Sequence, residues 1–177
     1  MTPLVVGMGD CVVSKDTEAS LVTYALGSCI AVSIYDPVTH VGGLLHFMLP
    51  ESNAKAGDSV ASPFRYADTG TPLLFRTAYQ FGAEKRRLQV AIAGGAAVVE
   101  HHELFNIGKR NLVALRKILW RAGVMVHAED CGGSDSRTVR LDIDTGRFWV
   151  RTSTDRDWQL LPVKAGGSLE DACRSSC

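Results

Sequence analysis

The sequence lacks the features that mark membrane-spanning, secreted and nucleic-acid-binding chains. It has no apolar run near the roughly 20 residues that a helix needs to cross a bilayer, and its start, MTPLVVGMGDC, has neither the basic residues nor the long apolar segment of a signal peptide. Nineteen basic residues balance nineteen acidic ones, so no net charge attracts nucleic acid or an anionic membrane. We therefore expect a cytoplasmic protein that is not membrane-inserted, does not bind nucleic acid and recognises its partners locally.

Cysteine is also scarce. The five cysteines form no C-x-x-C pair and are odd in number, which argues against a disulfide framework and against a zinc ribbon. Free thiols are the default in a reducing compartment, so one of them is available as a nucleophile. The adjacent His101 and His102, followed by Glu103, are a poor metal site because neighbouring side chains seldom face one ion. We expect neither a metal nor another cofactor.

Short runs of apolar and β-branched residues recur along the chain and predict a domain rich in strands. Strands are expected at residues 4–6, 21–24, 30–35, 41–49, 88–93, 124–128, 139–143 and 148–151. Two helices interrupt them, from about residue 68 to 82 and from about 109 to 122, where apolar residues recur every three or four positions. A chain of 177 residues suits one domain, which we place at residues 1–157, followed by a partly flexible tail at 158–177.

The segment Asp36-Pro37-Val38-Thr39 has the residues that a type I turn prefers at its first two positions. It predicts a β-hairpin in which Tyr35 faces His40. Facing residues in an antiparallel ladder keep a constant sum of their numbers, so this register places Cys29 directly opposite His46. Facing side chains project to the same side with Cβ atoms about 5 Å apart. We therefore expect the thiol and the imidazole to lie within reach of each other.

The predicted register also gives the hairpin two distinct faces. One face carries the large apolar side chains, namely Ile30, Val32, Ile34, Leu45, Phe47 and Leu49. The other carries Cys29 and His46 among smaller residues, and we expect it to point away from the apolar packing. A nearby imidazole stabilises a thiolate and can give a proton to a leaving group, so the pair predicts nucleophilic catalysis. A buried cysteine and a lone strand histidine are also ordinary core residues, and spacing alone leaves that alternative open.

The residues before Cys29 indicate how such a pair can act on a carbonyl group. Gly27 permits a bend in the backbone, and the amides of Ser28 and Cys29 can point at a developing oxyanion. Thr23 offers a hydroxyl that can orient the ring of His46, although by itself it is an ordinary strand threonine. These residues are the predicted surroundings of the nucleophile.

Residues 50–67 lack periodicity and are rich in serine, alanine, glycine and proline, which predicts a long surface loop. Phe64, Arg65 and Tyr66 lie near its end, where aromatic and arginine side chains can bind a substrate or a partner helix. They can equally anchor the loop to the domain. The basic residues of the helix expected at 109–122 have the common pattern of a solvated helix face.

At this hairpin the sequence resembles a known family, the chemoreceptor glutamine deamidases called CheD. The resemblance extends over about residues 3–155 and rests on several motifs in family order, namely TYALGSCIAVSIYDP, VGGLLHFMLP, RYADT, VAIAGGAAV, NIGKRN and AEDCGG. In that family the catalytic set is a cysteine, a histidine and a threonine with the spacing of Cys29, His46 and Thr23. The resemblance therefore implies these three residues as the catalytic set of this chain.

The resemblance also implies an activity, a fold and partners. The activity is hydrolysis of glutamine side-chain amides to glutamate on the cytoplasmic domains of methyl-accepting chemoreceptors, and some members also bind the phosphatase CheC. The implied fold is α+β, a layered α/β sandwich with mixed or antiparallel β-sheets flanked by helices, like that of cytotoxic necrotizing factor deamidases. We expect Cys29 thiolate, paired at rest with protonated His46, to form a thioester with the substrate.

Two other functions stay open from the sequence. The domain can be a regulatory module that binds receptors or CheC with little catalysis. It can also be a receptor glutamate methylesterase, which uses the same thioester and differs only in the leaving group. The sequence identifies neither the receptor, nor the glutamines, nor the oligomeric state, and it assigns no role to Cys173 and Cys177.

Overall fold

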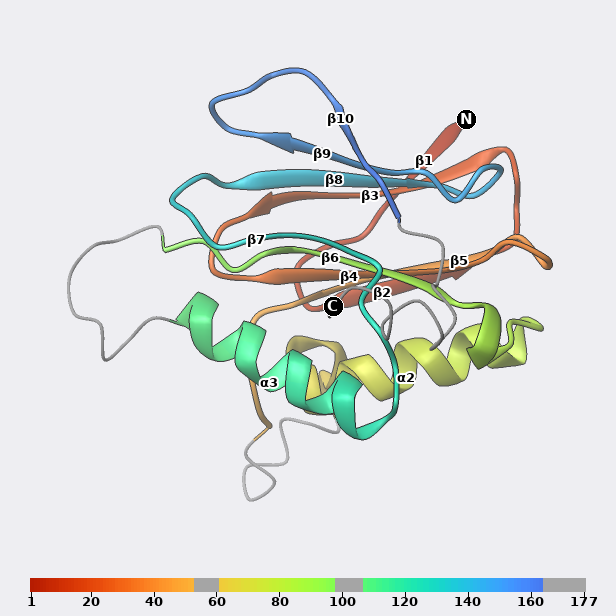
Figure 1. Ribbon diagram of the computed structural model, residues 1–177, viewed down its shortest axis with the longest axis horizontal. Helices are drawn as coiled ribbons and strands as arrows, with labels where there is room; N and C mark the ends of the chain where they lie inside the picture. Colours follow the sequence, from red (N-terminus) through yellow and green to blue (C-terminus); the bar gives the residue numbers. More distant parts are fainter. Residues whose placement is uncertain (53–60, 98–106, 164–177) are drawn as a thin grey trace, which may run out of the picture.

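The structure is a computed structural model that describes residues 1–52, 61–97 and 107–163 (Figure 1). Its elements are β1 (Thr2–Val5), β2 (Asp10–Ser14), β3 (Ala19–Leu26), β4 (Ile30–Asp36), β5 (Val41–Phe47), η1 (Pro63–Arg65), α2 (Ala67–Gln80), η2 (Lys85–Arg87), β6 (Gln89–Gly94), α3 (Ile107–Arg121), β7 (Ala128–Cys131), β8 (Arg137–Asp142), β9 (Phe148–Thr152) and β10 (Gln159–Leu161). Among the described helices, none combines the length and apolarity that a membrane crossing requires.

The elements form three layers. One sheet has the strand order β1-β3-β8-β9-β10 and the other has the order β2-β5-β4-β6-β7. Both sheets are mixed, because β1 runs parallel to β3 and β6 runs parallel to β7, while the other pairs are antiparallel. Helices α2 and α3 lie against the outer face of the second sheet (Figure 1). The prediction of an α+β sandwich of mixed sheets flanked by helices is confirmed.

The hairpin β4–β5 lies in the middle of the sandwich, and every residue of both strands is buried. One face packs against α2 and α3 and carries Ile30, Val32, Ile34, Leu45 and Phe47. The other face packs against the first sheet, where Ala31, Tyr35 and Leu44 meet Leu21, Leu141 and Phe148. The expectation that this second face points away from the apolar packing is therefore wrong, because the first sheet covers it.

The hairpin keeps the predicted faces but not the predicted register. Tyr35 faces Gly42, and Ala31 faces His46. The ladder is displaced by two residues from the predicted one, so Cys29 does not lie opposite His46. Side chains alternate with a period of two, and an even displacement leaves each of them on its face. The two residues therefore still belong to the same side of the hairpin.

Asp36 accounts for the displaced register. Its carboxylate is fully buried and accepts hydrogen bonds from Arg87 Nη2 at 2.7 Å and from the Glu84 amide at 2.9 Å. Burial alone raises the pKa of Asp36, but these hydrogen bonds bring it down to about 2. Asp36 is thereby held inside β4 opposite Val41, and the turn begins one residue later than the Asp-Pro pattern predicts.

Three strands differ from the predicted ones. β2 is not predicted, and β10 pairs with β9 beyond the boundary expected after residue 157, so the sheet extends into the expected tail. The apolar run at 124–128 predicts a strand, but β7 begins at Ala128, while Val124 and Val126 pack on the helical core without strand pairing. Apolar patterns report burial more reliably than pairing. Residues 164–177, with Cys173 and Cys177, lie outside the described residues.

Candidate active site

Thr23 and His46 come from different sheets and meet in the layer between them. Thr23 lies on β3 and His46 on β5, and Oγ1 of Thr23 is 2.8 Å from Nδ1 of His46. The Thr23 hydroxyl also donates to the carbonyl oxygen of Val6 at 2.7 Å. Both side chains are buried, with exposed fractions of 1% and 3%. The fold thus brings together two of the residues that the sequence predicts as catalytic.

The hydrogen bonds of Thr23 determine which nitrogen of His46 carries the proton. A hydroxyl has one hydrogen, and Thr23 gives it to the carbonyl of Val6, so its oxygen accepts the Nδ1–H of the imidazole. The neutral ring then has its lone pair on Nε2. This atom is buried and has no hydrogen-bond partner among the described residues. His46 therefore presents an unpaired base inside the protein.

Cys29 directly precedes β4 and is half-buried. It packs against the core between the two sheets, the same layer in which His46 meets Thr23. Because Ala31 faces His46, Cys29 takes the diagonal position on that face, for which Cα distances of about 7–8 Å are typical. No hydrogen bond joins the thiol to Nε2 in the described ranges. Both side chains therefore face the layer between the two sheets.

Burial favours the uncharged form of both groups. It lowers the pKa of His46 to about 4. It also raises the pKa of the Cys29 thiol, an effect that the backbone amide of the same residue partly offsets. At neutral pH the resting site therefore holds a thiol and a neutral imidazole. Both shifts disfavour the resting ion pair expected from the sequence.

The turn before Cys29 is anchored through three successive carbonyl groups. The bonds are Ala96 N to Gly27 O at 2.8 Å, Asn111 Nδ2 to Ser28 O at 3.0 Å and Gly95 N to Cys29 O at 2.8 Å. The backbone amides of Ser28 and Cys29 donate to no other residue in the described part of the chain. These are the two amides that the sequence suggests as oxyanion donors.

Asn111 belongs to this site, although sequence patterns do not single it out beyond its place in NIGKRN. It lies on α3, is fully buried, and also donates to the carbonyl oxygen of Met48 at 2.8 Å. A signal was present in the helix, because Asn111, Leu115 and Leu119 are four residues apart and all buried. A polar residue in the middle of an apolar stripe needs a polar partner, which predicts a specific contact.

The residues predicted as a weak binding cluster take different positions. Tyr66 is buried, Phe64 packs against the core beneath the helices, and Arg65 is exposed. The carbonyl oxygen of Arg65 accepts hydrogen bonds from the amides of Met48 and Leu49 at 2.9 and 3.0 Å. This segment therefore anchors the chain before α2 to the end of β5. Of the two interpretations, anchoring is the one these contacts favour for Phe64 and Tyr66.

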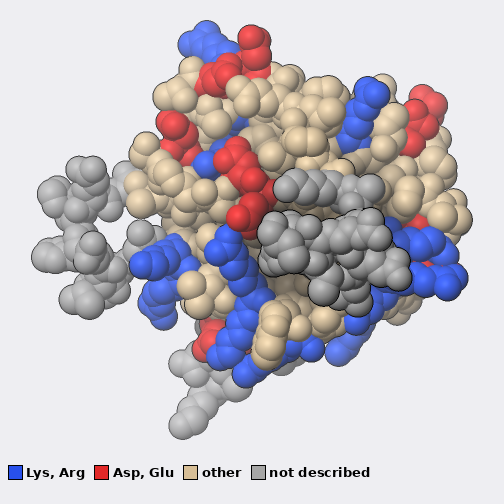
Figure 2. Space-filling model, in the orientation of Figure 1, with Lys and Arg blue, Asp and Glu red and all other residues tan. Residues whose placement is uncertain are grey.

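A cleft of about 760 Å³ lies between the end of β5 and α3. Its walls include Leu49, Pro50, Ile107, Val113, Arg110 and Lys117. Figure 2 shows lysine and arginine side chains gathered over this side of the molecule, where α3 lies. Leu49 directly follows Met48, so the cleft begins beside the Asn111 bridge. The lining also includes the acidic Glu51, so the walls are apolar and mixed in charge, with three basic residues, Lys109, Arg110 and Lys117, against one acidic residue.

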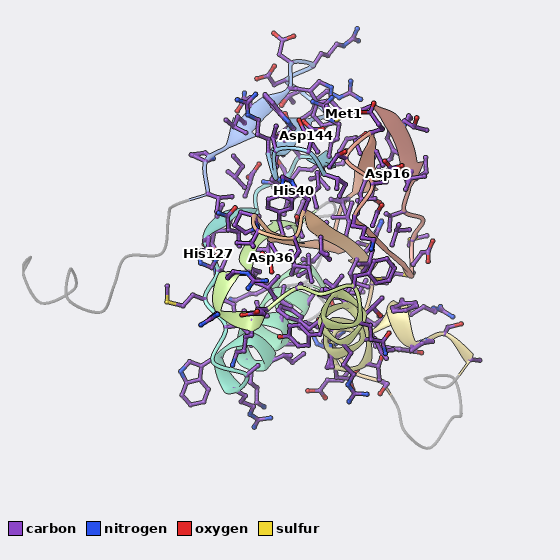
Figure 3. The ribbon with its side chains drawn as sticks, turned by 90° about the vertical axis from the view of Figure 1, so that its right-hand side faces the viewer. Met1, Asp16, Asp36, His40, His127 and Asp144 are labelled. Atoms are coloured by element: carbon purple, nitrogen blue, oxygen red, sulfur yellow. The ribbon has the colours of Figure 1, made fainter. Side chains whose placement is uncertain are left out.

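The other described histidines serve the fold. Figure 3 looks onto the end of the sandwich that holds the β4–β5 turn, where His40, Asp36 and Asp144 are labelled close together. Nδ1 of His40 lies 3.0 Å from Tyr35 Oη and 3.1 Å from the carbonyl oxygen of Asp144. Nδ1 of His127 accepts the amide of Val90 at 3.0 Å. Across the described ranges no three His, Cys, Asp or Glu side chains could hold a metal ion, and residues 101–103 lie outside them.

Comparisons with known proteins all match one family, CheD. The family model described as CheD chemotactic sensory transduction matches residues 48–152. The chain is 48% identical over 162 residues to the probable chemoreceptor glutamine deamidase CheD of Solibacter usitatus, covering 92% of this chain and 95% of that protein. It is 46% identical over 153 residues to the probable chemoreceptor glutamine deamidase CheD 1 of Syntrophus aciditrophicus, covering 86% of this chain and 96% of that protein. It is 40% identical over 157 residues to the probable chemoreceptor glutamine deamidase CheD of Pyrococcus horikoshii, covering 88% of this chain and 95% of that protein.

The matches differ in whether they include the candidate site. The family model begins two positions after His46 and so does not itself cover Thr23, Cys29 or His46. The match to the Solibacter usitatus protein leaves out only about 14 of the 177 residues, because it covers 92% of the chain. Positions 23 to 46 therefore lie within it wherever it begins.

Proposed function

This chain belongs to the CheD family, and from that premise we propose that it is a hydrolase that converts specific glutamine side chains of chemoreceptors to glutamate, with Cys29 as the nucleophile. The names of the relatives, chemoreceptor glutamine deamidases, support the substrate class. The observation that carries the proposal is the buried, unpaired Nε2 of His46, whose lone pair is set by Thr23 on the face of the sheet shared with the Cys29 thiol.

The first half of the reaction forms a thioester. Cys29 Sγ attacks the carbonyl carbon of the glutamine side chain while its proton passes to Nε2 of His46. The free amides of Ser28 and Cys29 stabilise the negative charge that develops on the substrate oxygen. Protonated His46 then gives this proton to the departing nitrogen. The carbon–nitrogen bond breaks, ammonia leaves and the acyl group stays on sulfur.

The second half releases the product. His46, neutral again, takes a proton from a water molecule as the water oxygen attacks the thioester carbonyl. The carbon–sulfur bond then breaks, Cys29 recovers its proton from His46, and the side chain leaves as glutamate. One amide and one water thus give one carboxylic acid and one ammonia, a balance that requires no cofactor.

The finer parts of the proposal concern the setting of this chemistry. A single deamidase domain that includes β10 acts in the cytoplasm on the cytoplasmic domains of methyl-accepting receptors. Its sandwich is of the kind found in cytotoxic necrotizing factor deamidases. The cleft between β5 and α3, with its basic and apolar walls, receives the receptor helix, and a CheC-type phosphatase is a second partner that competes for this surface.

Incubation with receptor cytoplasmic fragments, followed by peptide mass spectrometry, tests the proposed reaction. We expect conversion of a few defined glutamines to glutamate, with ammonia released in equal amount. Loss of methyl groups from glutamate esters, with glutamine unchanged, would identify a methylesterase instead. Receptor binding without either conversion would identify a regulatory module. Either of these two results would overturn the proposed deamidation.

The variant Thr23→Val removes the hydroxyl while keeping the shape of the side chain. His46 then loses the bond that orients its ring and keeps the lone pair on Nε2, and we expect kcat/KM to fall about tenfold, the value of one neutral hydrogen bond. The loss stays modest because an uncharged threonine cannot stabilise the imidazolium as an aspartate does. Steady-state kinetics on a receptor fragment measures the change.

Thr23→Ser is the matched control, because it retains the hydroxyl and removes only a methyl group. Its kcat/KM should stay within about threefold of the wild-type value, since both hydrogen bonds persist. Equal losses in the two variants, or wild-type kinetics in Thr23→Val, would mean that the hydroxyl does not orient His46.

A further inference from the structure

The peptide group between Ser28 and Cys29 is held from one side. A trans peptide is planar, so anchoring its C=O also sets the direction of the N–H of the following residue. Asn111 Nδ2 anchors the Ser28 carbonyl oxygen at 3.0 Å, and the N–H of the same peptide belongs to Cys29. A side chain of α3 therefore controls the orientation of the amide nearest the nucleophile.

Asn111 is itself firmly placed. It is fully buried, and its second hydrogen bond, to the Met48 carbonyl oxygen at 2.8 Å, ties it to the end of the strand that carries His46. Both of its partners are carbonyl groups, so the atom that faces them is the NH2 group, the only donor of a carboxamide. Oδ1 has no partner among the described residues. The donating half of the side chain is thus the half that the site uses.

The amide that Asn111 orients is unoccupied and lies on the side of the thiol. The Cys29 N–H donates to no other residue in the described ranges. Its influence is visible on the thiol of the same residue, whose pKa burial raises and this amide lowers. The neighbouring carbonyls of Gly27 and Cys29 are held by the backbone amides of Ala96 and Gly95, which a change of side chain other than to proline leaves in place. Asn111 is the side chain through which the orientation of this peptide can be changed.

We propose that Asn111 is a positioning residue for acyl transfer: by holding the Ser28 carbonyl, it aims the Cys29 amide at the oxyanion that forms when the thiol attacks. This inference rests on the proposed function in assuming an acyl-transfer reaction at Cys29. It assigns Asn111 no contact with the substrate. Its contribution appears only in steps that create a negatively charged oxygen.

Two reagents separate this role from a general effect on the thiol. Acylation of Cys29 by p-nitrophenyl acetate passes through an oxyanion, whereas alkylation by iodoacetamide displaces iodide at a saturated carbon and forms none. In Asn111→Leu we expect the acylation rate to fall about 100-fold, the usual effect of losing one oxyanion donor. The alkylation rate should stay within about threefold, because the thiol keeps its surroundings. Mass spectrometry of the Cys29 peptide measures both rates.

Leu119→Ala is the matched control, because it removes a buried side chain of the same helix away from the turn. It should leave the ratio of acylation to alkylation at the wild-type value. If Asn111→Leu also leaves this ratio unchanged, whether both rates stay or fall together, the inference is wrong.

Asn111→Ser serves if the leucine variant does not fold. Its small side chain leaves space for a water molecule that satisfies both carbonyls but holds the peptide less firmly. We expect an acylation rate about tenfold below wild type with unchanged alkylation, and a wild-type ratio would again reject the role. Neither reagent involves a receptor, so the two proposals are tested separately. If the wild-type protein fails to deamidate receptors, the proposed function is wrong, while the ratio of acylation to alkylation still tests the role of Asn111.

Discussion

Cys29→Ala is expected to lower kcat for receptor deamidation by roughly 10⁴-fold or more, to the level of the uncatalysed reaction. Without the sulfur no thioester forms, and the remaining oxyanion donors can only bind the substrate. Receptor binding should persist, because the thiol is half-buried and contributes little to a docking surface. Mass spectrometry of receptor glutamines over time measures the rate, and co-sedimentation with the receptor fragment measures binding.

Cys11→Ala is the control for this variant. Cys11 is also a partly buried free cysteine, but it packs on the helical side of the second sheet, and burial together with Asp10 raises its pKa to about 12. A thiol of this kind is inert, so activity should stay within about twofold of wild type. Undiminished deamidation by Cys29→Ala would require another nucleophile and reject the mechanism. Equal losses in both variants would point to the fold instead.

His46→Gln is expected to cost nearly as much, roughly 10³- to 10⁴-fold in kcat near neutral pH, because nucleophile and base act as a unit. A glutamine side chain retains polar groups for Thr23 but offers no base for the thiol proton. Only thiolate formed by ionisation into solvent can then attack, and the pKa of Cys29 lies above its ordinary value of 9.0. As the pH is raised toward that pKa, the residual rate should therefore increase about tenfold per pH unit, because the fraction of thiolate does so.

The pH profile of the wild-type protein distinguishes the neutral pair from an ion pair. With a pKa of about 4, His46 is the neutral base at every pH well above 4 and loses this role as the pH falls through 4. We expect kcat/KM to be nearly constant from about pH 5 to 8 and to decline below that range. An acid limb near 6.5, the ordinary pKa of histidine, would contradict the effect of burial on this ring.

His40→Asn is the matched control for the histidine variant. His40 lies in the same hairpin but in its turn, with a left-handed φ of 53° that asparagine tolerates. Its ring contacts Tyr35 and the backbone of Asp144 at the opposite end of the strands from His46. Wild-type kinetics are expected for His40→Asn. A loss comparable to that of His46→Gln would mean that any disturbance of the hairpin abolishes activity.

The faces of the hairpin could be predicted because they depend on a local rule. Side chains of a strand alternate between its two faces, so the pattern from Ile30 to Phe47 assigns each residue to one face. A shift of the partner strand by an even number of residues does not change that assignment. The register differs because Asp36 is paired inside β4, where its buried carboxylate contacts the partly buried Arg87. Arg87 is 51 positions away, and no pattern within the hairpin indicates it.

The amino-acid sequence by itself determined a strand-rich domain with two helices, the sidedness of Cys29 and His46, and the motifs shared with the CheD family, and that resemblance implied the α+β class. Each of these follows from residue identity or from short-range periodicity, which a linear chain carries directly. The tertiary structure alone decided that a second sheet covers the face of Cys29, that Thr23 sets the tautomer of His46, and that Asn111 reaches the turn. These depend on contacts between segments distant along the chain, because burial and hydrogen bonding across layers exist only after the sheets and helices have packed.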